Sequence, residues 1–130
     1  IRETIEDAGL SPGDIQYVNT HGTSTPKGDS TEVQCLKQVF GTALEKIPIS
    51  SNKSQIGHTL GAAAAIENAL TIEGLKRGII LPTINHIPDP RLDCVDVVPD
   101  EARRAEIEIA LSNAFGFGGT NCCVVFRRES

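Results

Sequence analysis

The sequence predicts one α/β domain, built from layers of helices and β-strands. Helical and strand-like patterns alternate along its 130 residues in the order α-β-α-β-α-β-β, which is typical of layered α/β folds. A helical pattern separates the first two strands and indicates a parallel β-α-β unit. A glycine-rich turn joins the last two strands and predicts a hairpin. No internal repeat or second domain boundary is visible.

The composition is that of an ordinary globular domain, with 39% hydrophobic and 22% charged residues. The formal net charge is -5 without any block of like charge, so no nucleic-acid partner is expected. No apolar run approaches the roughly 18 residues of a membrane helix. The four cysteines show no disulfide framework, which favours reduced thiols.

The first elements are short. Residues 2–8 have helical spacing, residues 11–14 form a turn, and residues 15–19 are a strand that runs into a polar loop at 20–28.

A second helix is predicted after this loop. Asp29 and Glu32 have the spacing of a capping box, Gly41 ends the helix, and residues 47–50 form the next strand. The apolar residues at helical spacing are Val33, Leu36, Val39 and Phe40.

Residues 58–77 predict the longest helix, and this helix lacks a polar side. The run at 60–70, LGAAAAIENAL, is small or apolar on nearly every face. Such a helix is normally buried all round. We therefore expect a further layer to cover it, and we expect the chain alone to associate through it.

The last part of the chain predicts strands joined by irregular segments. Residues 81–90 are punctuated by proline, and 94–98 allow one more short strand. Residues 106–115 alternate as a strand does, 116–121 form a tight turn, and 122–128 form the last strand.

Functional side chains are concentrated in loops at strand ends. The loop at 20–28 contains His21, and the loop at 51–57 contains Lys53 and precedes His58. Because the carboxyl ends of parallel strands lie side by side, and ligands bind there, these three side chains could converge.

Each of the three also has a structural interpretation. His21 could cap a turn, Lys53 could be a solvated loop lysine, and His58 could simply begin a helix. At a helix N-terminus, however, His58 would be disfavoured as an imidazolium, and a neutral imidazole can donate a hydrogen bond to developing negative charge. The third histidine, His86, is interpreted as structural.

The glycine-rich segment 115–121, FGFGGTN, is a weak match to a phosphate cradle, since it lacks lysine and joins two strands. It could expose backbone N–H groups beside a reacting centre, or it could be a hairpin turn with Phe117 as a plug. The cysteines are interpreted as small hydrophobes rather than nucleophiles. They are Cys35, Cys94, Cys122 and Cys123.

Three segments together resemble the C-terminal motifs of β-ketoacyl-acyl carrier protein synthases. They are NTHGTSTPKGDSTE (19–32), SSNKSQIGHTLGAAAAIE (50–67) and NAFGFGGTN (113–121). The nearest match is to the type II elongating enzymes of fatty-acid synthesis, and polyketide ketosynthases share the motifs. The resemblance extends over residues 1–130, which we treat as one C-terminal domain.

The resemblance implies a thiolase-like fold, in which two similar α/β halves stack as five layers, α-β-α-β-α. This chain resembles one half, with a mixed sheet and a C-terminal hairpin. The nucleophilic cysteine of the family belongs to the other half, so the resemblance implies that this chain alone cannot condense acyl groups. Ala64 stands where the family usually has glycine, which is a modest change.

The chemistry that the resemblance implies is a decarboxylative Claisen condensation. His21 and His58 match the two histidines that stabilise the enolate. Lys53 matches the family lysine, and Glu32 matches its ion-pair partner. Phe117 matches the gatekeeping phenylalanine, whose N–H completes an oxyanion hole.

The same resemblance assigns supporting residues. Thr23 and Thr25 would line the approach of the pantetheine arm. The remaining assignments are Gly118 and Gly119 as substrate-binding residues and Asp29 and Asn121 as structural support.

The resemblance also implies the partners. No cofactor or metal is expected, because substrates arrive on the phosphopantetheine of acyl carrier protein. We expect acyl carrier protein, the missing N-terminal half and a second copy as partners, in a bacterial cytoplasm or alternatively a plastid or mitochondrion. Two alternatives stay open: a polyketide ketosynthase domain and a non-condensing chain-length-factor type subunit.

Overall fold

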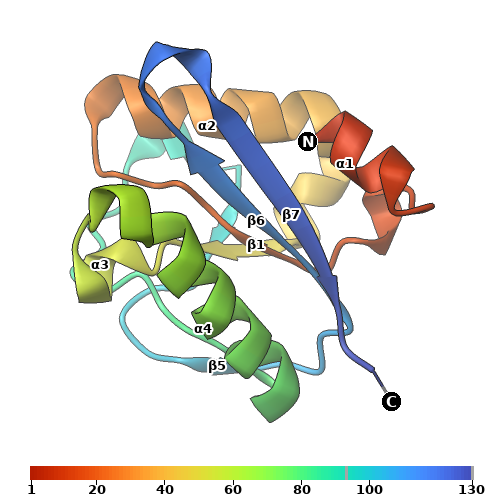
Figure 1. Cartoon of the computed structure of the whole chain (residues 1–130). Coiled ribbons are helices and arrows are strands. Elements are labelled where there is room, and N and C mark those ends of the chain that lie inside the picture. Colours follow the sequence, from red (N-terminus) through yellow and green to blue (C-terminus); the bar gives the residue numbers. More distant parts are fainter. Residues whose placement is uncertain (93, 130) are drawn as a thin grey trace.

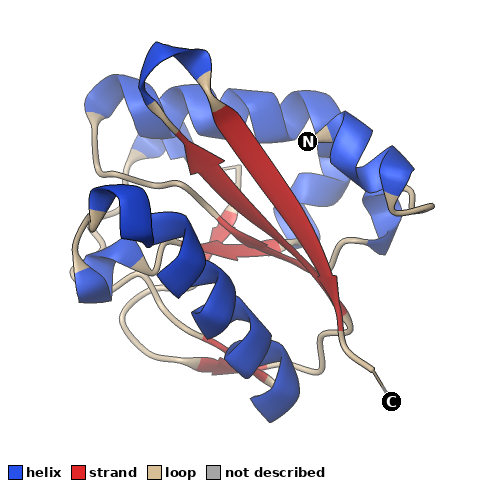
Figure 2. Cartoon of the chain, viewed as in Figure 1, coloured by secondary structure: helices blue, strands red, loops and turns tan. Residues whose placement is uncertain are grey.

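The structure is a computed structural model that describes residues 1–92 and 94–129, and it confirms the layered α/β architecture (Figure 1). Helices α1 (Arg2–Asp7) and α2 (Pro26–Phe40) lie on one face of a central sheet. Helix α4 (Ala63–Arg77) lies on the opposite face, so the sheet is the middle of three layers (Figure 2).

The central sheet has five strands in the described residues, in the order β4-β2-β1-β6-β7. Strand β1 pairs in parallel with both β2 and β6, and β2 pairs in parallel with β4, whereas β7 runs antiparallel to β6. Their bounds are β1 (Tyr17–Asn19), β2 (Pro48–Ser50), β4 (Asp96–Val97), β6 (Ile109–Phe115) and β7 (Asn121–Arg127). The predicted β-α-β unit and hairpin are therefore confirmed, and the carboxyl ends of β1, β2 and β6 share one edge.

A small antiparallel pair was not predicted. It consists of β3 (Ile79–Ile80) and β5 (Arg103–Arg104). Each strand has two residues, which is too short for an alternating pattern to stand out.

The core consists of two apolar clusters, one on each face of the sheet. Val18 and Leu111 belong to the cluster that contains Leu36 of α2, while Tyr17 and Ala110 belong to the cluster on the α4 face. Neighbouring residues of one strand thus enter opposite clusters, as the two-residue period of a strand requires. The sheet is therefore buried on both faces and gives rigid support to the loops at its ends.

Helix α2 begins earlier than predicted. Pro26 occupies its first turn, and the Thr25 hydroxyl accepts the N–H of Gly28 at 3.2 Å as the N-cap. The predicted capping box of Asp29 and Glu32 is wrong, because Glu32 lies in the second turn and its carboxylate binds other backbone groups.

The predicted helix at 58–77 begins later, at Ala63. The short helix α3 (Lys53–Ile56) and a 3-10 turn (Leu60–Ala62) precede it. Helix α4 buries one side against the sheet, but its Ile66 and the preceding Leu60 remain exposed. Within the described residues it is thus covered on one side only, and the second layer expected from its composition is not part of this chain.

Short 3-10 helices occupy several of the remaining connections, at Pro12–Asp14, Gly41–Lys46, Pro90–Leu92 and Phe117–Gly119. The last of these forms the tip of the hairpin between β6 and β7. Among the described residues, no helix is both long and apolar enough to cross a membrane.

Candidate active site

His21 lies just beyond the carboxyl end of β1, as predicted. Its Nδ1 accepts the backbone N–H of Phe115, at the end of β6, at 3.2 Å. The Phe115 ring lies beside the imidazole, with centroids 5.3 Å apart. The end of β6 therefore holds the His21 ring through both the backbone and the side chain of Phe115.

The backbone around His21 is held by a buried carboxylate. Glu32 accepts the N–H groups of His21 and Gly22, each at 2.9 Å, and an amide N–H of Asn113 at 3.2 Å. Gly22 has φ 36°, and a Cβ there would lie 2.6 Å from Cβ of Ser51. This close approach requires glycine and brings the loop after β1 against the start of the loop after β2.

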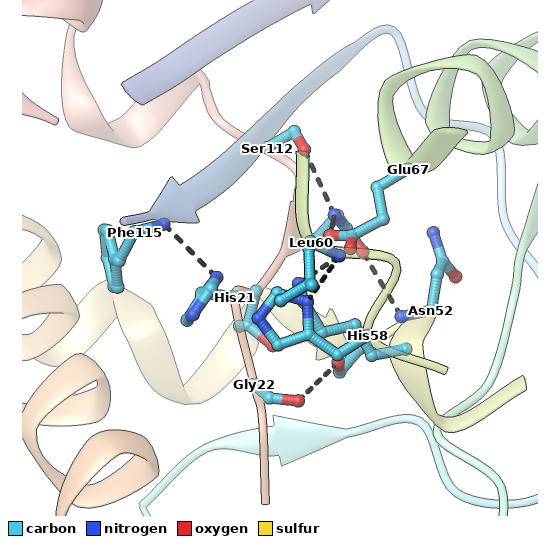
Figure 3. Close-up of polar contacts among 12 residues, drawn as sticks. His21, Gly22, Asn52, His58, Leu60, Glu67, Ser112 and Phe115 are labelled. Atoms are coloured by element: carbon cyan, nitrogen blue, oxygen red, sulfur yellow. Dashed lines mark hydrogen bonds and ion pairs between the residues drawn. The ribbon is translucent and has the colours of Figure 1, made fainter. Parts of the chain in front are cut away.

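His58 lies in the coil between α3 and the 3-10 turn (Figure 3). Its ring is nearly perpendicular to that of His21, at 88°, with centroids 5.7 Å apart. Its Nδ1 accepts the backbone N–H of Leu60 at 3.2 Å. The two histidines therefore converge as predicted, although His58 is exposed and does not sit at the start of α4.

Lys53 forms its ion pair with Glu67 rather than with Glu32. Nζ of Lys53 lies 2.7 Å from Oε1 of Glu67, and both side chains are almost fully buried. Asn19 donates its amide N–H to Oε2 of Glu67 at 3.2 Å and to Ser112 Oγ at 3.1 Å. The predicted pair with Glu32 is wrong, because the hydrogen bonds of Glu32 run to the backbone of the His21 loop.

Two groups of the site titrate away from their ordinary ranges. Partial burial and the positive charge of Lys53, together with His58, lower the pKa of His21. Burial raises the pKa of Glu32, although its hydrogen bonds from Gly22, His21 and Asn113 oppose the rise. A neutral His21 is therefore favoured over the imidazolium.

Both histidines use Nδ1 as an acceptor of a backbone N–H. In a neutral imidazole one nitrogen accepts and the other donates, so each ring carries its proton on Nε2. The two rings together provide two imidazole N–H donors at one edge of the sheet. Such donors are suited to stabilising a negatively charged oxygen.

The residues predicted from the glycine-rich turn lie at the tip of the hairpin. Phe117 is 97% exposed and therefore packs on almost nothing in the described chain. Gly118 and Gly119 have φ of 76° and 84°, which glycine adopts without strain, and Asn121 begins β7. Phe115, which was not singled out, is the phenylalanine that lies against His21.

The predicted substrate-binding threonines line a cavity that His58 also lines. The hydroxyls of Thr23 and Thr25 are 3.3 Å apart, and both side chains line a cavity of about 520 Å³. Lys53, His58 and Asp29 line the same cavity. Helix α2 begins here, with Asp29 in its first turn.

The remaining singled-out residues lie elsewhere. Cys123 packs against the core, and burial raises its pKa. Cys94 is also partly buried, whereas Cys35 and Cys122 are exposed, so the interpretation as small hydrophobes does not fit the latter two well. The backbone N–H of His86 donates to Asp100 at 3.4 Å.

Sequence reasoning missed several residues of this site. Glu67 had a visible signal, because it is the one carboxylate in the apolar run 60–70. Asn113 precedes the glycine-rich turn inside a predicted strand, where a buried amide is unusual. Asn19 and Leu60 carried no signal that distinguishes them from ordinary strand and helix residues.

Comparisons with known proteins agree with this geometry. Residues 1–86 match the family model described as beta-ketoacyl synthase, C-terminal domain. A 3-oxoacyl-[acyl-carrier-protein] synthase 2 of Staphylococcus aureus (strain COL) is 44% identical over 129 residues, which are 98% of this chain and 31% of the relative. The chain thus spans about a third of the length of the curated relatives that it matches.

Solved structures give the same result. A beta-ketoacyl synthase from Burkholderia phymatum STM815 superposes with a TM-score of 0.90 at 46% identity, over 97% of this chain and 30% of that one. The type II polyketide ketosynthase AntDE, in complex with its acyl-carrier protein AntF, superposes with a TM-score of 0.94 at 35% identity, over 99% of this chain and 32% of that one. This chain therefore belongs to the β-ketoacyl synthase family and carries its C-terminal domain.

Proposed function

We propose that this chain is the part of a 3-oxoacyl-acyl carrier protein synthase that decarboxylates the malonyl substrate during fatty-acid chain elongation. His21 and His58 are the residues that act on the malonyl thioester. The remainder of the enzyme, which this chain does not include, supplies the nucleophilic cysteine that carries the growing acyl chain. The substrates arrive on acyl carrier protein, so the enzyme needs no cofactor of its own.

The observation that carries this proposal is the matched hydrogen bonding of the two rings. Each Nδ1 is occupied by a backbone N–H, and the rings lie 5.7 Å apart. Both Nε2–H groups are then available to a single small anion. The lowered pKa of His21 keeps its ring neutral near pH 7.

The chemistry follows from this pair of donors. The bond between the malonyl carboxylate and its α-carbon breaks, CO2 leaves, and the electron pair moves onto the thioester carbonyl to give an enolate. The two Nε2–H groups stabilise the enolate oxygen, which is the charge that develops in the transition state. The enolate carbon then attacks the acyl thioester on the cysteine, and the thiolate leaves.

Lys53 acts on the electrostatics of the site. Its ion pair with Glu67 holds a positive charge near His21, where it disfavours the imidazolium. Glu32 positions the His21 loop through two backbone N–H groups. The threonine-lined cavity beside His58 admits the pantetheine arm. Phe117, exposed at the tip of the hairpin, is the gatekeeping residue.

The decisive experiment substitutes His21→Ala in the complete ketosynthase that carries this chain. Release of CO2 from malonyl-acyl carrier protein should fall by at least about a hundredfold, within the range of an oxyanion-hole donor. Acyl loading of the cysteine should change only a few-fold, which serves as the internal control for folding. Undiminished CO2 release would remove His21 from this role.

A polyketide ketosynthase is the second candidate, and the superposition on AntDE favours it. The two functions differ in how many condensations precede reduction. With malonyl-acyl carrier protein and no reductase present, a fatty-acid enzyme should stop after one extension. A polyketide enzyme should release poly-β-ketone products of several extensions.

The chain-length-factor alternative predicts no CO2 release from the wild-type protein.

The complete enzyme is expected to act as a homodimer in a bacterial cytoplasm. A single-protomer mass in solution would contradict the dimer.

A further inference from the structure

Ser51 lies where the segments that carry the two histidines meet. It is buried, and it follows β2 directly, two residues before Lys53. Its hydroxyl donates to the carbonyl oxygen of Gly22 at 2.7 Å. Because Gly22 is the residue after His21, this hydrogen bond joins the His21 loop to the segment that leads through α3 to His58.

Two further hydrogen bonds hold Ser51 to its own surroundings. Its backbone N–H donates to the hydroxyl of Thr83 at 2.9 Å, and its carbonyl oxygen accepts the hydroxyl of Ser54 at 2.9 Å. Thr83 is fixed in turn, because its backbone N–H donates at 2.8 Å to Val98, which follows β4. Ser51 is therefore attached to α3 and to the end of β4, while its side chain reaches the His21 loop.

The His21 loop is joined to this segment on both sides of His21. Before it, the backbone N–H of Thr20 donates to the carbonyl oxygen of Ser50 at 2.8 Å and continues the pairing of β1 with β2. Such a main-chain bond can be made by any residue except proline. After His21, the hydrogen bond to Gly22 needs the side-chain donor of Ser51, which therefore has a role that its backbone alone cannot fill.

We propose that Ser51 is a positioning residue that sets the separation of His21 and His58. The two rings lie 5.7 Å apart, and their Nε2–H groups can reach one oxygen atom only while this separation is kept. This inference rests on the proposed function, because it concerns how the two donors are held at one anion. Ser51 acts through the main chain of Gly22 and not through contact with the reacting atoms.

The test compares two buried hydroxyls that each donate to a backbone carbonyl. Ser51→Ala removes the bond to Gly22 and leaves the backbone N–H and C=O of residue 51 in place. Thr71→Val is the matched control, since the Thr71 hydroxyl donates to the carbonyl oxygen of Glu67 at 2.8 Å within α4 and joins no two loops. Both variants are made in the complete ketosynthase, and both should lower the urea midpoint of unfolding by similar amounts, because each loses one buried hydrogen bond.

The first readout is the ratio of two rates, those of malonyl decarboxylation and of acyl loading of the cysteine. Decarboxylation needs both donors at one oxygen, whereas a loss of folded enzyme lowers the two rates equally. In Ser51→Ala the ratio should fall roughly two- to twelvefold, the factor that one ordinary hydrogen bond corresponds to. In Thr71→Val it should keep the wild-type value. An unchanged ratio in Ser51→Ala, or an equal fall in Thr71→Val, would overturn the inference.

The second readout is the pKa of His21, followed through the chemical shifts of its isotope-labelled ring. Partial burial lowers this pKa, the charges of Lys53 and His58 lower it further, and Glu67 opposes them. Lys53 and His58 belong to the segment that Ser51 attaches to the His21 loop. Without that attachment the pKa should rise toward 6.5 in Ser51→Ala but not in the control, and a wild-type value in Ser51→Ala would contradict the positioning role.

The outcomes separate this inference from the proposed function. If His21→Ala leaves decarboxylation intact, the proposed function fails, whatever Ser51→Ala does. If His21→Ala abolishes decarboxylation but Ser51→Ala leaves the ratio or the pKa unchanged, only this inference fails. Should Ser51→Ala not fold, Ser51→Cys takes its place, because a thiol is a weak hydrogen-bond donor. Both changes are then expected in smaller degree, and the absence of either overturns the inference.

Discussion

Two buried glutamates flank the histidine pair, and their charges are balanced in different ways. Glu67, on α4, lies 2.7 Å from the ammonium of Lys53. Glu32, on α2, is held instead by the backbone N–H groups of His21 and Gly22. Each also accepts one asparagine amide at 3.2 Å, from Asn19 and Asn113 respectively.

The difference shows that a buried carboxylate can serve either of two purposes. Glu67 fixes a cation, and that cation acts on His21 through its field. Glu32 fixes a segment of main chain, and so it acts on His21 through position. One carboxylate therefore sets the electrostatics of the site and the other sets its geometry.

The largest effect is expected from Lys53→Met, which leaves Glu67 buried without its cation. The free energy of unfolding should fall by about 3–5 kcal/mol, because breaking a buried pair leaves an uncompensated charge. Urea titration of the chain at low concentration measures this. The double variant Lys53→Met with Glu67→Leu should recover most of the loss, and equal stability of the single and double variants would contradict the ion pair.

A smaller loss is expected from Glu32→Gln. The amide NH2 group cannot accept the N–H groups of His21 and Gly22, so one buried donor loses its partner. This should cost about 1–3 kcal/mol. Glu3→Gln, at an exposed position of α1, is the control and should stay within about 0.5 kcal/mol of wild type. Similar losses in the two variants would show that Glu32 has no special role.

The raised pKa of Glu32 predicts how the difference between wild type and Glu32→Gln varies with pH. Because the folded-state pKa lies above the ordinary 4.5, the folded state binds a proton more tightly than the unfolded state. The resulting stabilisation is fully present below pH 4.5 and is lost as the pH rises through the folded pKa. The advantage of wild type over Glu32→Gln should therefore shrink as the pH rises in urea titrations, and an advantage that grows would contradict the raised pKa.

The smallest effect is expected on the pKa of His21. This effect distinguishes most directly between the electrostatic role of Glu67 and the positional role of Glu32. Lys53→Met removes one of the causes that lower the pKa of His21, so that pKa should rise toward its ordinary 6.5. Glu32→Gln should leave the pKa nearly unchanged, since Glu32 binds the backbone of His21 and not its ring. Chemical shifts of the His21 ring, followed over pH, measure the His21 pKa in both variants. Equal changes of that pKa in the two variants would contradict the difference between the roles of Glu67 and Glu32.

The sequence was sufficient for the architecture and for the convergence of the histidines. Parallel strands must bring their carboxyl ends to one edge, so His21 and His58 could be placed together from the β-α-β pattern. The partner of Lys53 could not be found in this way. Whether Glu32 or Glu67 faces the lysine depends on how α2 and α4 rotate when they pack, and spacing along one helix does not determine that.

The start of α4 was mispredicted for a related reason. Residues 58–62 have helical composition, but the left-handed backbone at Leu60 interrupts the helix. A neighbouring glycine makes such a conformation expected at 61 rather than at 60. Strain of this kind is visible only in the three-dimensional structure.

The tautomers of both histidines are set by main-chain groups, at Leu60 and Phe115. Every amino acid except proline supplies a backbone N–H, so the hydrogen bond survives any side chain that tolerates the local backbone, which at Leu60 is left-handed. Selection can then vary both side chains, for instance to fit a different acyl chain, without disturbing the protonation of the ring beside them. What this part of the site must retain is therefore the backbone conformation at the two donors, and the side chains around it can change.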